Sequence, residues 1–369
     1  MTAPLLQIVH VSDLHFRQRQ GPAPVTARWT SRRAPAATSV FQGMEGHDPQ
    51  VLGPLVRSIR ERVRPSKDAF RHGTYLAVTG DLATLGDTAS ADRAEKLIKD
   101  IASQAGLPDP LVVYGNHDVW PGELPLFARA DLDARRSALR QRPLHAGDRP
   151  ARMLGAGRFS LWSLTTVRHG RFENTLALGH IGTDRYWEHD KKMAPQLDVL
   201  AAAAAAAPPA TGEHEVRIAL THHPVIQPRK WPWKGLRNWK EIENAMGAPD
   251  PAGGPHRLVR VVLSGHNHAL YPPLGELAAN VAMRNVRGVH VQLVAGTATQ
   301  LRHGAPPARV DRDLHQLHCW QLIRFYEEPD GRLQLERIVF VRSGGVSPEY
   351  RPVSVSANPR DVAERAYLW

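Results

Sequence analysis

Residues 111–118 constrain the fold most, because an apolar run there ends in Gly-Asn-His-Asp. Gly115 predicts a sharp turn, since glycine has no Cβ to clash. Open α/β sheets bind their ligands beyond the carboxyl ends of the strands. We therefore expect Asn116, His117 and Asp118 to lie at such an edge, where they can bind metals or transfer protons.

The same arrangement occurs four more times along the chain. Apolar runs end in Val-Ser-Asp-Leu-His at residues 11–15, Thr-Gly-Asp at 79–81, Thr-His-His-Pro at 221–224 and Ser-Gly-His-Asn-His at 264–268. One such run arises by chance in many proteins. Five in one chain predict that the strand ends meet in a common site.

The side chains at these strand ends form a set of metal ligands. There are seven candidates: Asp13, His15, Asp81, Asn116, His222, His266 and His268. Asp and His together suit Zn, Fe, Mn, Co or Ni, whereas a calcium site would be nearly all oxygen. The set is large enough for two ions that share a carboxylate. With two carboxylates only, a pair of divalent ions would keep a positive charge that suits a phosphate.

Taken in order, the five motifs resemble those of the calcineurin-like metallophosphoesterase superfamily, and their local sequences are similar to the bacterial class III cyclic-nucleotide phosphodiesterase branch. The resemblance implies an α/β fold, a four-layer α/β/β/α sandwich of two mixed sheets with flanking helices. It also implies a phosphoric ester hydrolase with two Mn, Fe or Zn ions, in which a hydroxide bridging the ions attacks phosphorus.

The resemblance further implies a role for each motif residue. It divides the ligands between two ions, one held by Asp13, His15 and His268, the other by Asn116, His222 and His266, with Asp81 bridging. His117 would assist the leaving oxygen. Asp118 would orient His117, because an imidazole beside two cations needs a partner that fixes its tautomer. The family's His-x-Pro pattern favours His222 as the ligand, with His223 as the alternative.

A small phosphodiester such as a cyclic nucleotide is the favoured substrate, and a nuclease or a phosphomonoesterase of the same fold is the alternative. A non-catalytic scaffold would have lost motif residues, and here every motif position is filled. Residues 229–240 place three tryptophans among five basic residues. This pattern favours base stacking by Trp231 and Trp233, a structural lid or membrane contact. His223 and Arg302 are weaker candidates for substrate contact.

The formal net charge of +11 has two interpretations, a GC-rich genome's composition or an anionic substrate such as nucleic acid. The single cysteine, Cys319, excludes an intramolecular disulfide and fits a reducing compartment. The first residues lack the charged and apolar regions of a signal peptide, and no run approaches the ~20 apolar residues of a membrane span. We therefore expect a cytoplasmic protein without stable membrane insertion.

One domain is expected over residues 1–342, with insertions at 17–46 and 227–256 at the active-site rim, and a tail over 343–369 that packs on the surface. Residues 17–46 are either a disordered insertion or a substrate-gating loop. Apolar spacing predicts helices over 48–62, 88–105, 126–139 and 190–207. Strands over 159–164 and 175–181 should open the second sheet, and a hairpin over 317–342 should complete it. His10 is interpreted as a core residue.

Overall fold

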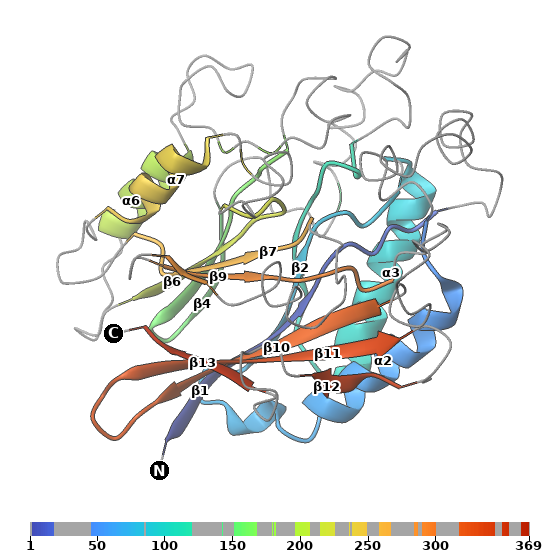
Figure 1. The fold of residues 1–369 in the computed structure, drawn as a ribbon, viewed down its shortest axis with the longest axis horizontal. Helices are drawn as coiled ribbons and strands as arrows, with labels where there is room; N and C mark the ends of the chain where they lie inside the picture. Colours follow the sequence, from blue (N-terminus) through green and yellow to red (C-terminus); the bar gives the residue numbers. More distant parts are fainter. Residues whose placement is uncertain are drawn as a thin grey trace, which may run out of the picture.

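The fold is known from a computed structural model (Figure 1). It describes residues 2–17, 46–84, 86–119, 142, 151–167, 179, 181, 196–206, 215–225, 236, 238–248, 258–266, 284–286, 290–299, 317–343, 349–353 and 363–368. The predicted helix over 126–139 and most of the two predicted insertions lie outside these residues. Within the described residues, no helix is both long and apolar enough to cross a membrane.

The first sheet is mixed and has the strand order β12-β11-β10-β1-β2-β3, with β13 paired to β11. Its strands are β1 (Ala3–Val11), β2 (Thr74–Thr79), β3 (Leu111–Val113), β10 (Leu317–Glu327), β11 (Leu333–Ser343), β12 (Arg351–Val353) and β13 (Ala363–Tyr367). β1, β2 and β3 run parallel, and the remaining pairs are antiparallel. The three parallel strands therefore end at the same edge of the sheet.

The second sheet is also mixed, in the order β4-β5-β6-β7-β9-β8. It comprises β4 (Ala151–Ala156), β5 (Phe159–Ser163), β6 (Val216–Leu220), β7 (Val261–Ser264), β8 (Arg284–Val286) and β9 (His290–Val294). Its four central strands, β5, β6, β7 and β9, are parallel. The edge strands β4 and β8 are antiparallel to their neighbours.

The two sheets pack face to face, and helices cover the outer face of each (Figure 1). Apolar residues of both sheets, among them Ile8, Phe159 and Phe325, form the buried core between them. α2 (Pro49–Val63) and α3 (Thr88–Ala105) pack on the first sheet. α6 (Gln196–Ala206) and α7 (Trp239–Met246) pack on the second. The predicted four-layer α/β/β/α sandwich is confirmed.

The two helices on the first sheet each begin directly after an aspartate that caps them. Asp48 caps α2 by accepting a hydrogen bond from the backbone N–H of Gln50. Asp87 caps α3 in the same way through Ser90, and α3 ends at Gly106 in the left-handed conformation. Such caps satisfy backbone groups that a helix end leaves without partners. The predictions over 48–62 and 88–105 are therefore confirmed.

The predicted hairpin over 317–342 forms, but its place in the second sheet is wrong. β10 pairs with β1, so the hairpin belongs to the first sheet. Trp320 faces the helix-side core, while Ile323 and Phe325 face the core between the sheets. A strand with apolar residues on both faces fits the middle of a sheet, and β1 offers it an open edge. Two segments of the predicted surface tail add β12 and β13 beside β11.

His10 lies in the core between the sheets and is fully buried. Burial and, next, the nearby Arg337 lower the pKa of His10 to about 3, against a smaller opposing effect of Asp13. An unfolded chain binds a proton there below its ordinary pKa of about 6.5, whereas the folded chain does not. Stability from this residue is therefore complete above that pH and is lost as the pH falls toward 3.

His10→Gln is expected to make the unfolding free energy less dependent on pH between about 6.5 and 4. Glutamine keeps the hydrogen-bonding groups but does not titrate, so the slope should fall by up to about 1.4 kcal/mol per pH unit. Urea unfolding at several pH values measures this slope. An unchanged slope would contradict a buried, neutral His10. His72→Gln, at a partly buried histidine beside the start of β1, is the control.

Candidate active site

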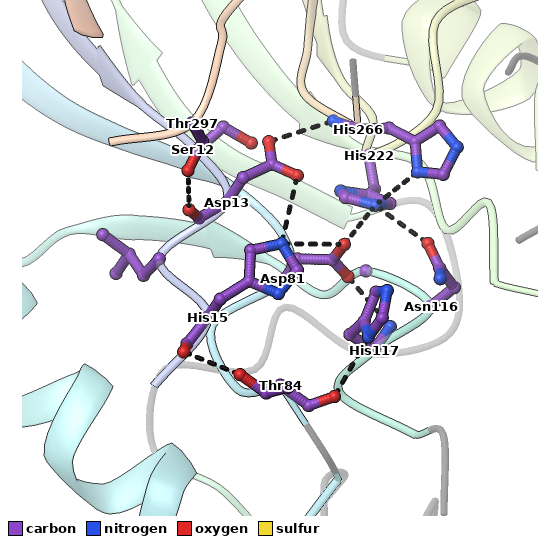
Figure 2. Close-up of polar contacts among 12 residues, drawn as sticks. Ser12, Asp13, His15, Asp81, Thr84, Asn116, His117, His222, His266 and Thr297 are labelled. Carbon is purple, nitrogen blue, oxygen red and sulfur yellow. Dashed lines mark hydrogen bonds and ion pairs between the residues drawn. The ribbon is translucent and has the colours of Figure 1, made fainter. Parts of the chain in front are cut away.

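The carboxyl ends of five strands meet at one edge of the sandwich, as the sequence predicts. β1, β2 and β3 lead into the motifs at 13–15, 81 and 116–118, while β6 and β7 lead into those at 222–223 and 265–266. Figure 2 shows the side chains converging from both sheets. The described ligand candidates are buried, except for His266, which is partly buried. The predicted residues within the structure therefore form one cluster.

Four of these residues have a backbone conformation that side chains rarely adopt. Among the described non-glycine residues, φ is positive only at Asp13 (56°), His15 (49°), Asp81 (51°) and His266 (66°). Such conformations cost on the order of 1–3 kcal/mol each and persist where the surrounding structure imposes them. The strained positions coincide with candidate ligands. This coincidence marks the cluster as a functional site independently of the motifs.

Asp81 is the centre of the cluster. Its Oδ2 lies 3.2 Å from His222 Nε2 and 3.7 Å from His15 Nε2. Its Oδ1 accepts a hydrogen bond of 2.9 Å from the backbone N–H of His117. Asp81 thus faces candidate ligands from both halves of the site, as a bridging carboxylate must.

The orientation of His222 suits a metal ligand. Its Nδ1 donates to the backbone carbonyl of Thr79 at 2.8 Å, so the ring in its neutral form has its lone pair on Nε2. That Nε2 lies 3.1 Å from Asn116 Oδ1 and 3.2 Å from His266 Nδ1. A hydrogen bond to the outer ring nitrogen is the usual way in which proteins fix a ligating histidine.

His223 has different partners from His222, although potential ligand atoms of His222, His223 and His266 lie within 4.8 Å of one another. Its Nδ1 lies 2.8 Å from the hydroxyl of Thr166, which also accepts from the backbone N–H of His223 at 3.2 Å. The ring packs against that of His266, with centroids 4.3 Å apart. His222, rather than His223, thus faces Asp81 and Asn116. Substrate contact by His223 stays a prediction.

The expectation that Asp118 orients His117 is wrong. The Asp118 carboxylate accepts from the backbone N–H groups of Ala83 at 2.9 Å and of Gly115 at 2.8 Å. The Nδ1 of His117 instead lies 3.0 Å from the backbone carbonyl of Thr84. Adjacent residues of a tight turn project in different directions, so adjacency in sequence did not imply contact. Asp118 stabilises the turn that carries His117.

Two motif glycines are required because neighbouring groups approach them closely. A Cβ at Gly115 would lie 2.2 Å from Asp81 Oδ1, and one at Gly265 would lie 1.8 Å from Ser12 Oγ. Neither glycine has a positive φ. The absence of a Cβ expected at Gly115 is therefore needed for this close approach, and not for a left-handed backbone conformation. The lack of a side chain lets the five strand ends come together.

Threonines that the sequence analysis did not single out hold the ligand-bearing loops. Thr84 Oγ1 donates to the carbonyl of His15 at 2.7 Å, and Thr297 Oγ1 donates to that of Asp13 at 2.8 Å. Thr299 donates likewise to the carbonyl of Leu14. These bonds go to backbone atoms, which no motif specifies. For Thr297 and Thr299 the only signal in the sequence was Gly-Thr-Ala-Thr at residues 296–299, shortly after β9.

Burial and neighbouring charges shift the proton affinities of the cluster. Burial alone would raise the pKa of Asp81, but the imidazoles of His222, His117 and His15 hold it well below its usual range. Burial lowers the pKa of His222, yet Asp81 outweighs this effect and raises it to about 9. Burial and Asp81 raise the pKa of Asp118 to about 7. Asp81 is thus the anionic group at the centre.

The described residues fit a pair of metal ions. Asp81 Oδ2 is buried and makes no hydrogen bond, although three imidazoles surround its carboxylate. Ligand atoms lie within 4.8 Å of one another both in the group of His15, Asp81 and His117 and in that of Asp13, Asp81 and His222. Asp81 belongs to both groups. A carboxylate oxygen aimed at imidazole nitrogens is the donor set of a transition-metal site.

Four predicted site residues lie outside the described residues: His268, Trp231, Trp233 and Arg302. Their roles stay predictions. Trp239, the third tryptophan of the basic segment, lies at the start of α7 and packs against the core of that layer. Trp239 therefore contributes to the packing of this layer.

Comparison with known proteins gives four results. A family model described as calcineurin-like phosphoesterase matches residues 6–270. A dimetal phosphatase from Danio rerio is 13% identical, with a TM-score of 0.45, over 96% of this chain and 100% of that chain. SoxB, a sulfate thiohydrolase from Termus thermophilus, is 13% identical, with a TM-score of 0.36, over 92% of this chain and 56% of that chain. No curated protein matches the sequence.

Proposed function

Because the chain belongs to the calcineurin-like phosphoesterase family and is a phosphoric ester hydrolase, we propose that it hydrolyses small phosphodiesters, foremost cyclic nucleotides, at a dinuclear metal centre. The observation that carries the proposal is the convergence of the motif residues on Asp81, which faces imidazoles of both halves of the site. The sequences around the motifs, which resemble class III cyclic-nucleotide phosphodiesterases, support the choice of substrate.

In this proposal the seven predicted ligands, six of which the structure describes, would hold the ions, and Asp81 would be the shared carboxylate. Bound there, the ions would neutralise phosphate charge and lower the pKa of water. The chain itself keeps each ligand in place: His222 through the carbonyl of Thr79, and Asp13 through Thr297 and the backbone N–H of His266.

His117 is proposed to supply the proton that the leaving oxygen needs. Its Nδ1–H donates to the Thr84 carbonyl, so the proton for the leaving oxygen must be carried on Nε2 of the doubly protonated ring, which becomes neutral as it gives that proton up. Burial lowers the pKa of His117, and the Asp81 carboxylate opposes this effect. Hydrolysis breaks one P–O bond, and the departing alkoxide takes a proton as it leaves. The His117 ring lies against that of His15, with centroids 4.9 Å apart, and is therefore beside the metal site.

The Mn²⁺-loaded protein is expected to hydrolyse bis(4-nitrophenyl) phosphate and a 3′,5′-cyclic nucleotide with a higher kcat/KM than 4-nitrophenyl phosphate. A phosphodiesterase site must accommodate a second ester group, which a monoester cannot use. Initial rates on the three substrates at one metal concentration measure this preference. A higher kcat/KM on the monoester would make the protein a phosphomonoesterase.

The basic segment at 229–240 supports the alternative substrate, a nucleic acid. If Trp231 and Trp233 stack on a base, replacing both by alanine should raise KM for nucleotide diesters about tenfold per base, since stacking contributes about 1–3 kcal/mol. Bis(4-nitrophenyl) phosphate should be nearly unaffected. Trp239→Ala is the matched control, because that tryptophan packs on the core. Internal cleavage of single-stranded DNA or RNA, with binding that weakens steeply with salt, would favour a nuclease.

A further inference from the structure

A chain of buried polar side chains runs across five strands of the first sheet, on the face that borders the apolar core between the two sheets. It runs from Glu364 to Arg337 (3.1 Å), from Arg337 Nε to Gln321 Oε1 (2.5 Å), from Gln321 Nε2 to His10 Nδ1 (2.5 Å) and from His10 Nε2 to Thr79 Oγ1 (2.8 Å). Its three central members and Thr79 are at most 1% exposed. A second nitrogen of Arg337 donates to the carbonyl of Val294 in the other sheet.

The donor and the acceptor of each hydrogen bond between Arg337 and His10 follow from the chemistry of the side chains. An arginine side chain only donates, so the oxygen of Gln321 must face Arg337 and its amide nitrogen must face His10. His10 Nδ1 therefore accepts, and the ring proton is on Nε2. From there it donates to the Thr79 hydroxyl. Burial, which keeps His10 uncharged, is consistent with this tautomer.

The chain ends at the residue that supports the candidate metal site. Thr79 is the last residue of β2 and precedes Gly80 and Asp81. Its backbone carbonyl accepts from His222 Nδ1 at 2.8 Å and from Ser12 Oγ at 3.0 Å. Thr79 therefore connects motif residues of the first sheet with His222 of the second.

Such a chain is not explained by stability alone. The surrounding core is apolar, and a buried polar network is often no more stable than well-packed apolar side chains of similar volume. Buried polar groups do, however, fix one arrangement where apolar groups allow several. The site requires one fixed position of the two sheets relative to each other, because ligands from both sheets must meet within a few ångströms.

We propose that His10, Gln321 and Arg337 are positioning residues that fix Thr79, and through its carbonyl the ligand His222, in the geometry that binds metal. The inference rests on the proposed metal centre. These three side chains act through Thr79 and would contact neither the substrate nor an ion. Removing one of these side chains should therefore weaken the binding of the ion that His222 would hold, in a protein that still folds.

The test is a Co²⁺ titration of the metal-free protein, followed by visible absorption, with Tm measured on the same samples. Thr79→Val keeps the shape and the backbone carbonyl but removes the hydroxyl that His10 contacts. We expect it to weaken one of two Co²⁺ binding steps about tenfold, the lower end of the range for partners of ligands. Thr79→Ser, which keeps the hydroxyl, should restore the affinity.

His10→Leu acts from the other end of the same bond and should weaken the same step, whereas His10→Gln should restore it. Ile8→Ala is the matched control: it truncates a fully buried residue of β1 on the same face, two positions from His10. It should lower Tm and leave both Co²⁺ affinities unchanged. All titrations are made well below the lowest Tm of the set.

The outcomes separate this inference from the proposed function. Two Co²⁺ steps of unchanged affinity in both Thr79→Val and His10→Leu would overturn the positioning role and leave the metal centre intact. An equal loss in Ile8→Ala would overturn it too, because the effect would then follow stability. A wild-type protein that binds no Co²⁺ would overturn the metal centre itself.

Discussion

Replacing Asp81 with asparagine is expected to abolish phosphoester hydrolysis and to lower the metal content. Asp81 faces His15 and His222 from one carboxylate oxygen, at 3.7 and 3.2 Å. Asparagine has the same shape but no charge, so two cations held near it would repel each other without screening. Metal analysis after exhaustive dialysis, together with turnover of bis(4-nitrophenyl) phosphate, measures both effects.

A matched control is Asp87→Asn, which makes the same chemical change at the N-cap of α3, where asparagine caps nearly as well. It should keep full metal content and activity. The backbone at Asp81 has a φ of 51°, which asparagine also tolerates, so Asp81→Asn should fold. Full metal occupancy with normal turnover in Asp81→Asn would refute the shared-carboxylate model.

Much of the fold follows from local patterns in the sequence. Apolar spacing predicted two helices, and the turn sequence Glu-Pro-Asp-Gly between two apolar runs predicted the β10–β11 hairpin. The partner of that hairpin could not be predicted in this way. Pairing with β1 joins segments about 310 residues apart, as in His10 and Gln321, and no local pattern specifies so distant an edge.

The candidate site, too, could be predicted only in part from the sequence. The motif residues were predicted to meet because parallel strands end at one edge of a sheet, and those within the described residues do meet. What holds them was not predictable, because it consists mainly of backbone atoms: the carbonyls of Thr79 and Thr84 bind the rings of His222 and His117. A carbonyl is present at every position, so sequence cannot mark the one that is used.

His117→Ala is expected to retain both metal ions and to lower kcat by roughly 10²–10⁴-fold, the usual range for a positioned acid or base. Its ring is held by the Thr84 carbonyl, and its backbone N–H, which alanine keeps, donates to Asp81. Removing the imidazole should therefore leave the ligand cluster in place. Metal analysis and kcat on the same preparations test both halves of the expectation.

The size of the loss should depend on the leaving group. A nitrophenolate leaves without a proton, whereas the alkoxide of a nucleotide ribose needs one, so a general acid matters far more for the second substrate. The loss in His117→Ala should thus be much smaller for bis(4-nitrophenyl) phosphate than for a cyclic nucleotide. An equal loss on both would assign His117 to phosphate binding. His72→Ala, which removes an imidazole that packs on Phe159, should change neither rate.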